Sequence, residues 1–238
     1  MLYFNTNGQH VSSYGGAGVA IRTNVQKEYV REACDIYEIC VTGLKGGHCY
    51  DDICYGNANS LLIRILRRLK ESAPISLMSF DGGVSRSELC HEATAQIALR
   101  YYDVARCYEN RVSFEETFEH AKEQILEEYS PLAPELNIYL RKLRPEMVTS
   151  VMTTDSFYRL LNIFTLMPDG IQTMSTACPG SIGSLVNIGM VLADTETFSI
   201  SAELIGEHIG AMEEICAKFS LAANICGCSI QFFGVHLP

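Results

Sequence analysis

The sequence predicts an α/β protein of the α+β type: a split β-α-β antiparallel sheet with two helices, followed by an incomplete mixed α/β portion. Between residues 34 and 143 the hydrophobic patterns run strand, helix, strand, strand, helix, strand, which is the split β-α-β order. After residue 150 helices and strands still alternate, but the strands are too few to close a sheet. The 238 residues allow one large or two small domains, at roughly 100–200 residues each.

The elements of the first half follow from periodicity. Residues 34–42 alternate near period two and predict a strand. Residues 57–71 predict a helix, because the apolar stripe Leu62, Ile65, Leu66 and Leu69 is flanked by basic residues. A capping box formed by Ser113 and Glu116 predicts a second helix over 114–129. Further strands are expected at 75–80, 94–104 and 137–143, the last one ending before Pro145.

The second half predicts two more helices and three more strands. Thr153 or Thr154 can cap a helix through FYRLLNIF. Residues 186–203 read as a hairpin that turns at 194–196. A helix is expected over about 206–222, with Ile209, Met212, Cys216 and Phe219 on its inner side, and a last strand over 229–235.

Composition and charge exclude several classes of protein. The net charge is −10, whereas a nucleic-acid-binding surface needs clustered Lys and Arg. No apolar run approaches the roughly 18 residues of a membrane span, and the start MLYFNTNGQH has no secretory signal pattern. We therefore expect a cytoplasmic protein whose ten cysteines are free thiols.

Catalytic motifs are scarce. The run from Tyr14 to Gly18 resembles a dinucleotide fingerprint only superficially, because no clear strand precedes it and no helix follows it; a turn or a strand edge is favoured. Cys226-Gly-Cys228 is the only close cysteine pair, and a second pair at zinc-site spacing is missing. Buried thiols are therefore favoured over a structural zinc site.

One of the six histidines stands apart from the others. His48 follows Gly43-Leu44-Lys45-Gly46-Gly47, between a predicted strand and a predicted helix. Glycines permit tight turns and close approach to a ligand, so a histidine held there could donate a hydrogen bond to a substrate carbonyl or oxyanion. The alternative is a turn with an incidental histidine.

Several collinear segments together resemble the bacterial aminoacyl-histidine dipeptidases, cytosolic zinc-dependent enzymes related to carnosinases and aminoacylases. The run GLKGGH at 43–48 and the segment MPDGIQ-x-MS at 167–175 are the most specific in combination. The resemblance also rests on Asp52-Ile53, Asn57-Ala58-Asn59, Phe80-Asp81-Gly82-Gly83, Glu92-Ala93, Gly180 and Val186-Asn187-Ile188-Gly189.

The resemblance implies a domain layout, a reaction and a site. Residues 1–20 would be a remnant of the catalytic domain, 21–165 a lid or dimerisation domain, and 166–238 a returning part of the catalytic domain. His48 would help to polarise the scissile carbonyl of a small peptide, with Gly46, Gly47 and Ser87 also at the substrate. The family binds zinc and uses the lid to form a homodimer.

The sequence also departs from the family pattern. Most of the family's metal ligands fall outside the chain, and the closest match to its N-L-D segment is Tyr3-Phe4-Asn5. Cys49, Tyr50, Ser87, Cys90 and His91 replace other residues of the family's substrate region. We therefore expect that this chain alone binds no zinc, and its status as an enzyme is left open.

Three hypotheses follow. The first is a dipeptidase-like chain that hydrolyses small dipeptides only when a metal-binding segment completes it. The second is a non-catalytic dimerisation or peptide-binding module derived from the family. The third is an independent thiol or metal protein that uses Cys226 and Cys228.

Overall fold

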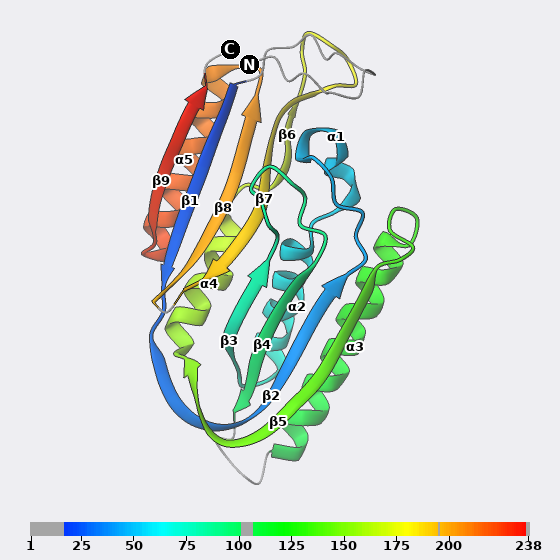
Figure 1. The fold of residues 1–238 in the computed structure, drawn as a ribbon, viewed down its shortest axis with the longest axis vertical. Coiled ribbons are helices and arrows are strands. Elements are labelled where there is room, and N and C mark those ends of the chain that lie inside the picture. Colours follow the sequence, from blue (N-terminus) through cyan, green and yellow to red (C-terminus); the bar gives the residue numbers. More distant parts are fainter. Residues whose placement is uncertain (1–16, 101–106, 195, 237–238) are drawn as a thin grey trace.

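The protein consists of a single sheet with its long helices packed on one face (Figure 1). The computed structural model describes residues 17–100, 107–194 and 196–236. Nine strands in this part of the chain form the sheet, in the order β5-β2-β4-β3-β7-β8-β1-β9, with β6 paired to β7. Every strand pairing within it is antiparallel.

The first half of the sheet is a split β-α-β unit, as predicted. We call it the first unit. It contains β2 (Tyr29–Thr42), α2 (Ala58–Ser72), β3 (Ile75–Gly82), β4 (Ala93–Arg100), α3 (Cys107–Tyr129) and β5 (Asn137–Met152). A short helix α1 (Cys49–Asp52) and a 3-10 turn η1 (Ile53–Tyr55) lie between β2 and α2.

The second half repeats the same topology. This second unit contains β1 (Ala17–Gln26), α4 (Thr154–Leu166), β7 (Ile182–Ala193), β8 (Thr197–Gly206), α5 (Ile209–Cys226) and β9 (Ser229–His236), with β6 (Gly170–Met174) as an addition. Its strand order β9-β1-β8-β7 corresponds to β5-β2-β4-β3 of the first unit. The first unit is therefore inserted between the first strand and the first helix of the second unit.

This arrangement explains why the second half has too few strands when it is read alone. Its missing strand, β1, comes from the stretch that precedes the first unit. The boundary predicted after residue 20 falls inside β1, and the boundary predicted after residue 165 falls in the last turn of α4. The rest of the predicted 1–20 segment, residues 1–16, lies outside the described residues.

The two units share one hydrophobic core beneath the sheet. It combines Phe80, Phe114 and Phe118 of the first unit with Phe157, Phe198 and Phe219 of the second. Fully burying a side chain of this size contributes about 1.5–3 kcal/mol, so this core is the main source of cohesion. Along the sheet itself, β3 and β7 pair only at Gly82 and Val191.

Three details of the sequence prediction were wrong. Helix α3 begins at Cys107 instead of 114, and the Ser113 hydroxyl donates to the carbonyl of Ser72 instead of capping. Strand β5 continues through Pro145 to Met152, which an edge strand permits because its outward backbone groups need no partner. Ile209 at the start of α5 is exposed.

The other predicted helices and strands lie within about five residues of the observed bounds, except that residues 101–104 of the predicted strand 94–104 lie outside the described residues. Strands β1 and β6 were not predicted. Asn57 caps α2 by accepting from the amide of Asn59 at 2.9 Å, and Thr153 caps α4. The predicted hairpin is β7 and β8, closed by the Asp194 carboxylate, which accepts from the amide of Thr197. None of the helices in the described part of the chain has the length and apolar character of a membrane span.

Candidate functional site

Two loops of the first unit lie side by side and carry all four predicted site residues. The loop after β2 contains Gly46, Gly47 and His48, and the loop between β3 and β4 contains Ser87. The Cys49 amide donates to the Ser87 carbonyl at 3.0 Å, and the Leu89 amide donates to the Gly47 carbonyl at 2.8 Å. His48 and Glu88 form an antiparallel bridge. The fold therefore brings Gly46, Gly47, His48 and Ser87 together.

His48 is oriented by the helix that it caps. Its Nδ1 accepts from the amide of Tyr50 at 3.3 Å, at the N-cap position of α1, and the residue is half-buried. In a neutral imidazole one ring nitrogen accepts and the other carries the proton. With Nδ1 accepting, the proton of the neutral ring is on Nε2.

The glycines before His48 are required by the backbone. Gly46 and Gly47 have φ angles of 67° and 117°, in the region that L-residues with a side chain rarely adopt. A Cβ on Gly46 would also lie 3.2 Å from the Cβ of His91. The run Gly46-Gly47 therefore sets the path that leads the chain into His48.

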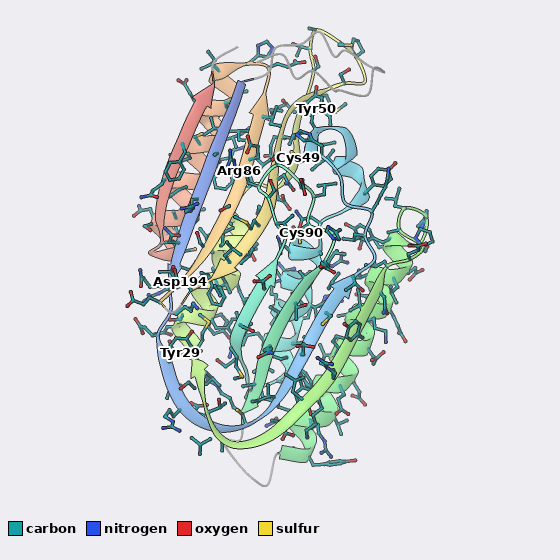
Figure 2. All side chains as sticks on the ribbon, in the orientation of Figure 1. Tyr29, Cys49, Tyr50, Arg86, Cys90 and Asp194 are labelled. Atoms are coloured by element: carbon teal, nitrogen blue, oxygen red, sulfur yellow. The ribbon has the colours of Figure 1, made fainter. Side chains whose placement is uncertain are left out.

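The thiols in this region are core groups. Cys49 and Cys90 are buried, and Figure 2 shows them near α1 and the adjoining ends of β3 and β4. Burial raises the pKa of the Cys90 thiol to about 12, and its Sγ donates to the carbonyl of Glu92 at 3.0 Å. A thiol in this state is a poor nucleophile at neutral pH, because the reactive form is the thiolate.

Asn187, on β7 of the second unit, holds the Ser87 loop in place. Its Nδ2 donates to the carbonyls of Arg86 and Glu88, at 2.8 Å each. Its Oδ1 accepts from Nδ2 of Asn57 at 3.1 Å, and all of its side chain is buried. Sequence reasoning gave Asn187 no role, although it lies in the quoted segment Val186–Gly189.

The backbones of the two units also approach each other closely where the Ser87 loop meets β7. Gly83 has a φ angle of 75°, and a Cβ there would lie 1.9 Å from the carbonyl oxygen of Gly189. A Cβ on Gly189 would lie 2.4 Å from the carbonyl oxygen of Ser85. Only glycine fits at either position, so the loop rests directly on β7.

Asp169 of the MPDGIQ segment makes a further connection between the units. Its Oδ2 accepts from the Ser60 hydroxyl of α2 at 2.6 Å, and its Oδ1 accepts from the amide of Ile188 at 3.2 Å. The motif therefore links the start of α2 to β7. Its contribution to the site is to position these two elements.

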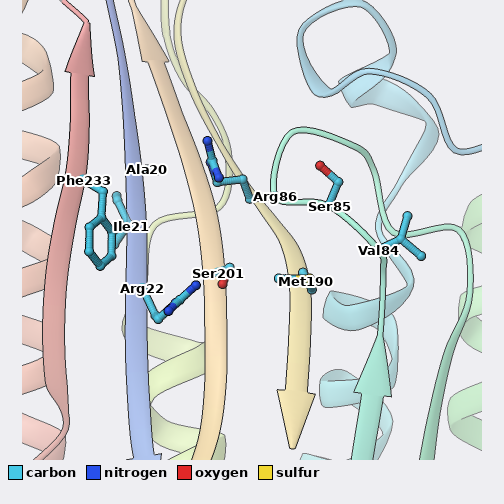
Figure 3. A pocket seen from close by; sticks show the side chains of 9 residues that line it. All are labelled: Ala20, Ile21, Arg22, Val84, Ser85, Arg86, Met190, Ser201 and Phe233. Atoms are coloured by element: carbon cyan, nitrogen blue, oxygen red, sulfur yellow. The ribbon is translucent and has the colours of Figure 1, made fainter.

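Beside the Ser87 loop lies a pocket of about 200 Å³ (Figure 3). Its wall includes Arg22 of β1, Ser201 of β8, and Ser85 and Arg86 of the β3–β4 loop. The Ser85 and Ser87 hydroxyl oxygens lie 3.1 Å apart. Sequence reasoning did not identify this pocket, because its residues come from five separate stretches of the chain.

The described residues do not fit a zinc ion. Residues 17–100, 107–194 and 196–236 contain no group of three or more His, Cys, Asp or Glu side chains placed to hold a metal. Cys226 and Cys228 flank Gly227, whose φ angle of 64° ends α5. Burial raises the pKa of both thiols, to about 11 for Cys228, which opposes the thiolate form that binds metals.

The other histidines in the described part of the chain have local roles. His120 bonds with Gln124 along α3 at 3.0 Å, and His208 occupies the N-cap position of α5. His91 lies against Gly46.

Comparison with known proteins relates the chain to dipeptidases. No family model matches it. The cytosol non-specific dipeptidase of Escherichia coli (strain K12) is 29% identical over 182 residues, which cover 74% of this chain and 35% of that protein. The aminoacylhistidine dipeptidase of Vibrio alginolyticus superposes with a TM-score of 0.84 at 20% identity, over 94% of this chain and 44% of that one.

The chain therefore spans between a third and a half of the length of these two proteins. The sequence match and the fold match agree with each other and with the motifs quoted above. Together they establish that this chain is related to the dipeptidase family.

Proposed function

We propose that this chain is the peptide-binding part of a dipeptidase-type hydrolase, acting on small dipeptides when a metal-binding segment completes it. The observation that carries the proposal is the pairing of the His48 loop with the Ser87 loop. The names of the two similar proteins support the same substrate class.

His48 would act by donating a hydrogen bond. Because Nδ1 accepts from the amide of Tyr50, a neutral His48 ring carries its proton on Nε2. When the scissile carbonyl is attacked its oxygen gains negative charge, so a donor fixed beside that oxygen stabilises the transition state more than the substrate. The hydroxyl of Ser87 would supply a second polar contact, and the absence of a side chain at the exposed Gly47 would leave room for the peptide backbone.

Zinc is the metal that the resemblance implies, and the described residues provide no set of ligands for it. We therefore assign no step of the reaction to a metal held by this part of the chain. The domain roles remain part of the proposal: a lid over 21–165 and a returning catalytic portion over 166–238. A cytoplasmic location is inferred from the name of the E. coli relative.

A chimera would test the proposal. Residues 17–236 would replace the matching segment of the E. coli dipeptidase, which supplies the remaining part of a dipeptidase. We expect metal-dependent dipeptide hydrolysis, and about a 10²- to 10³-fold loss of kcat with His48→Ala, which is the cost of one oxyanion donor. His48→Gln, which keeps an N–H donor, should recover part of the loss, and His120→Ala should have no effect. Full activity of the folded His48→Ala chimera would refute the role of His48.

The second candidate is a non-catalytic dimerisation or peptide-binding module. It is favoured by the lack of a metal-ligand set among the described residues. It predicts that the chain binds dipeptides equally well with zinc and with a chelator, and that it forms a homodimer. Calorimetric titration and light scattering would measure the two properties. A chimera with dipeptidase activity would favour the hydrolase instead.

A further inference from the structure

The residue directly opposite His48 in the two paired loops is Glu88. The two backbone hydrogen bonds that join the loops, at 3.0 and 2.8 Å, lie one residue to either side of this pair. His48 and Glu88 therefore form a non-hydrogen-bonded antiparallel pair, in which the Cα atoms lie about 4.5 Å apart and the side chains are closest. Opposite residues of such a pair project to the same face. The imidazole and the carboxylate thus leave the loops side by side.

The backbone of Glu88 is fixed by the second unit. Its carbonyl oxygen accepts from Nδ2 of the buried Asn187 at 2.8 Å. The next residue, Leu89, is buried in a small apolar cluster with Cys49 and Leu185. The direction in which the Glu88 side chain leaves the loop is therefore set by the fold, and the side chain itself is exposed to a ligand.

The carboxylate of Glu88 has no basic partner within the described part of the chain. None of the ion pairs between described residues includes it. Arg86, two residues earlier in the same loop, pairs with Glu203 at 2.6 Å. The Nζ of Lys45 lies 3.8 Å from the centre of the Tyr55 ring. A glutamate is negatively charged at neutral pH, so a cationic ligand group beside His48 would meet an opposite charge.

We propose that Glu88 is a specificity-determining residue, which binds an ammonium group of the peptide that His48 holds. The inference rests on the proposed function, in which His48 donates to the scissile carbonyl. In a dipeptide with a free amino terminus, only three covalent bonds separate the ammonium nitrogen from that carbonyl oxygen. Such a peptide therefore presents a cation and a carbonyl close together, as His48 and Glu88 present their side chains. A lysine side chain is the other source of an ammonium group in a dipeptide.

The binding test uses the chain by itself, in the presence of a metal chelator. An NMR titration compares alanylalanine with N-propionylalanine, which is the same molecule without its amino group. We expect alanylalanine to bind about 5- to 50-fold more tightly, between the effect of an exposed ion pair and that of a buried charge-assisted hydrogen bond. Glu88→Gln should remove this preference and leave the affinity for N-propionylalanine unchanged. The matched control, Glu123→Gln at an exposed position of α3, should preserve it.

A second pair of ligands separates the two sources of the ammonium group. Alanyl-lysine and alanylnorleucine both have a free amino terminus, and only alanyl-lysine carries a second ammonium group. We expect Glu88→Gln to weaken the binding of both by the same factor, which identifies the amino terminus as the group bound. Weakening of alanyl-lysine alone would assign the contact to the lysine side chain. Unchanged affinity of Glu88→Gln for every one of these ligands would overturn the inference.

Kinetics of the chimera separate this inference from the proposed function. In an active chimera, Glu88→Gln should lower kcat/KM for alanylalanine mainly by raising KM, whereas His48→Ala lowers kcat. An active chimera that is indifferent to Glu88→Gln would overturn the ammonium contact and leave the hydrolase in place. An inactive chimera, together with Glu88-dependent binding by the chain, would do the reverse. An inactive chimera and a chain that binds no alanylalanine would overturn both. The bond from Asn187 uses the backbone carbonyl of Glu88, so Glu88→Gln should preserve the fold.

Discussion

Replacing Asn187 by leucine should both destabilise the protein and loosen the candidate site. The variant loses two hydrogen bonds to the carbonyls of Arg86 and Glu88 and one from Asn57. Each buried hydrogen bond contributes about 0.5–1.5 kcal/mol net. Leucine keeps a similar volume, so we expect the free energy of unfolding to fall by about 2–4 kcal/mol without a large cavity term.

Urea denaturation measures this loss, and amide hydrogen exchange shows where it acts. The amides of Cys49 and Leu89 join the two site loops, so their protection should fall more than that of the β8 amides. The control is Asn162→Leu, at an exposed position of α4. If Asn187→Leu lowers the free energy of unfolding by less than about 0.5 kcal/mol, the range of ordinary surface substitutions, then Asn187 does not support the loop as we argue.

Three further predictions concern the two units. Arg100 is buried, with its Nε 3.0 Å from the Glu32 carboxylate. Arg100→Ala should lower the free energy of unfolding by about 3–5 kcal/mol, whereas the same change at the exposed Arg141 should lower it by at most about 1 kcal/mol. Equal losses in urea denaturation would contradict this prediction. Gly83→Ala should destabilise strongly, since its Cβ would meet a backbone oxygen at 1.9 Å, and an unchanged Tm would refute that contact. Burial lowers the pKa of Lys70 to about 8, below its unfolded value near 10.5, so the free energy of unfolding should rise with pH between about 8 and 10.5 and fall as the pH drops through 8. Lys70→Gln should remove this pH dependence from the urea denaturation midpoints. An unchanged pH dependence in the variant would show that Lys70 is not its source.

Local patterns predicted most elements because each one depends on residues close in sequence. The apolar stripe of 57–71 and the cap at Asn57 define α2 without reference to the rest of the chain. The start of α3 and the end of β5 were misjudged for the opposite reason. Ser113 bonds to α2 instead of its own helix, and Pro145 is tolerated only because β5 lies at the edge of the sheet.

The candidate site was predictable in part. The run Gly46-Gly47-His48 could be recognised as a candidate site from its residue types and spacing, and the family resemblance added Ser87. Asn187 gave no signal, because its partners Arg86 and Glu88 lie about 100 residues away in the chain. The pocket around Arg22 gave none, because its residues come from several separate strands and one loop. No periodicity or local motif reports a hydrogen bond across that separation.

By itself, then, the sequence determined the helices, most of the strands, the split β-α-β order and the histidine loop, since these depend on local propensity and on short motifs. The tertiary structure alone decided that β1 completes the second unit and that two copies of one topology share a sheet and a core. It also decided which loops meet. These features arise from pairing between distant strands, where backbone hydrogen bonding and burial of apolar surface select the partner.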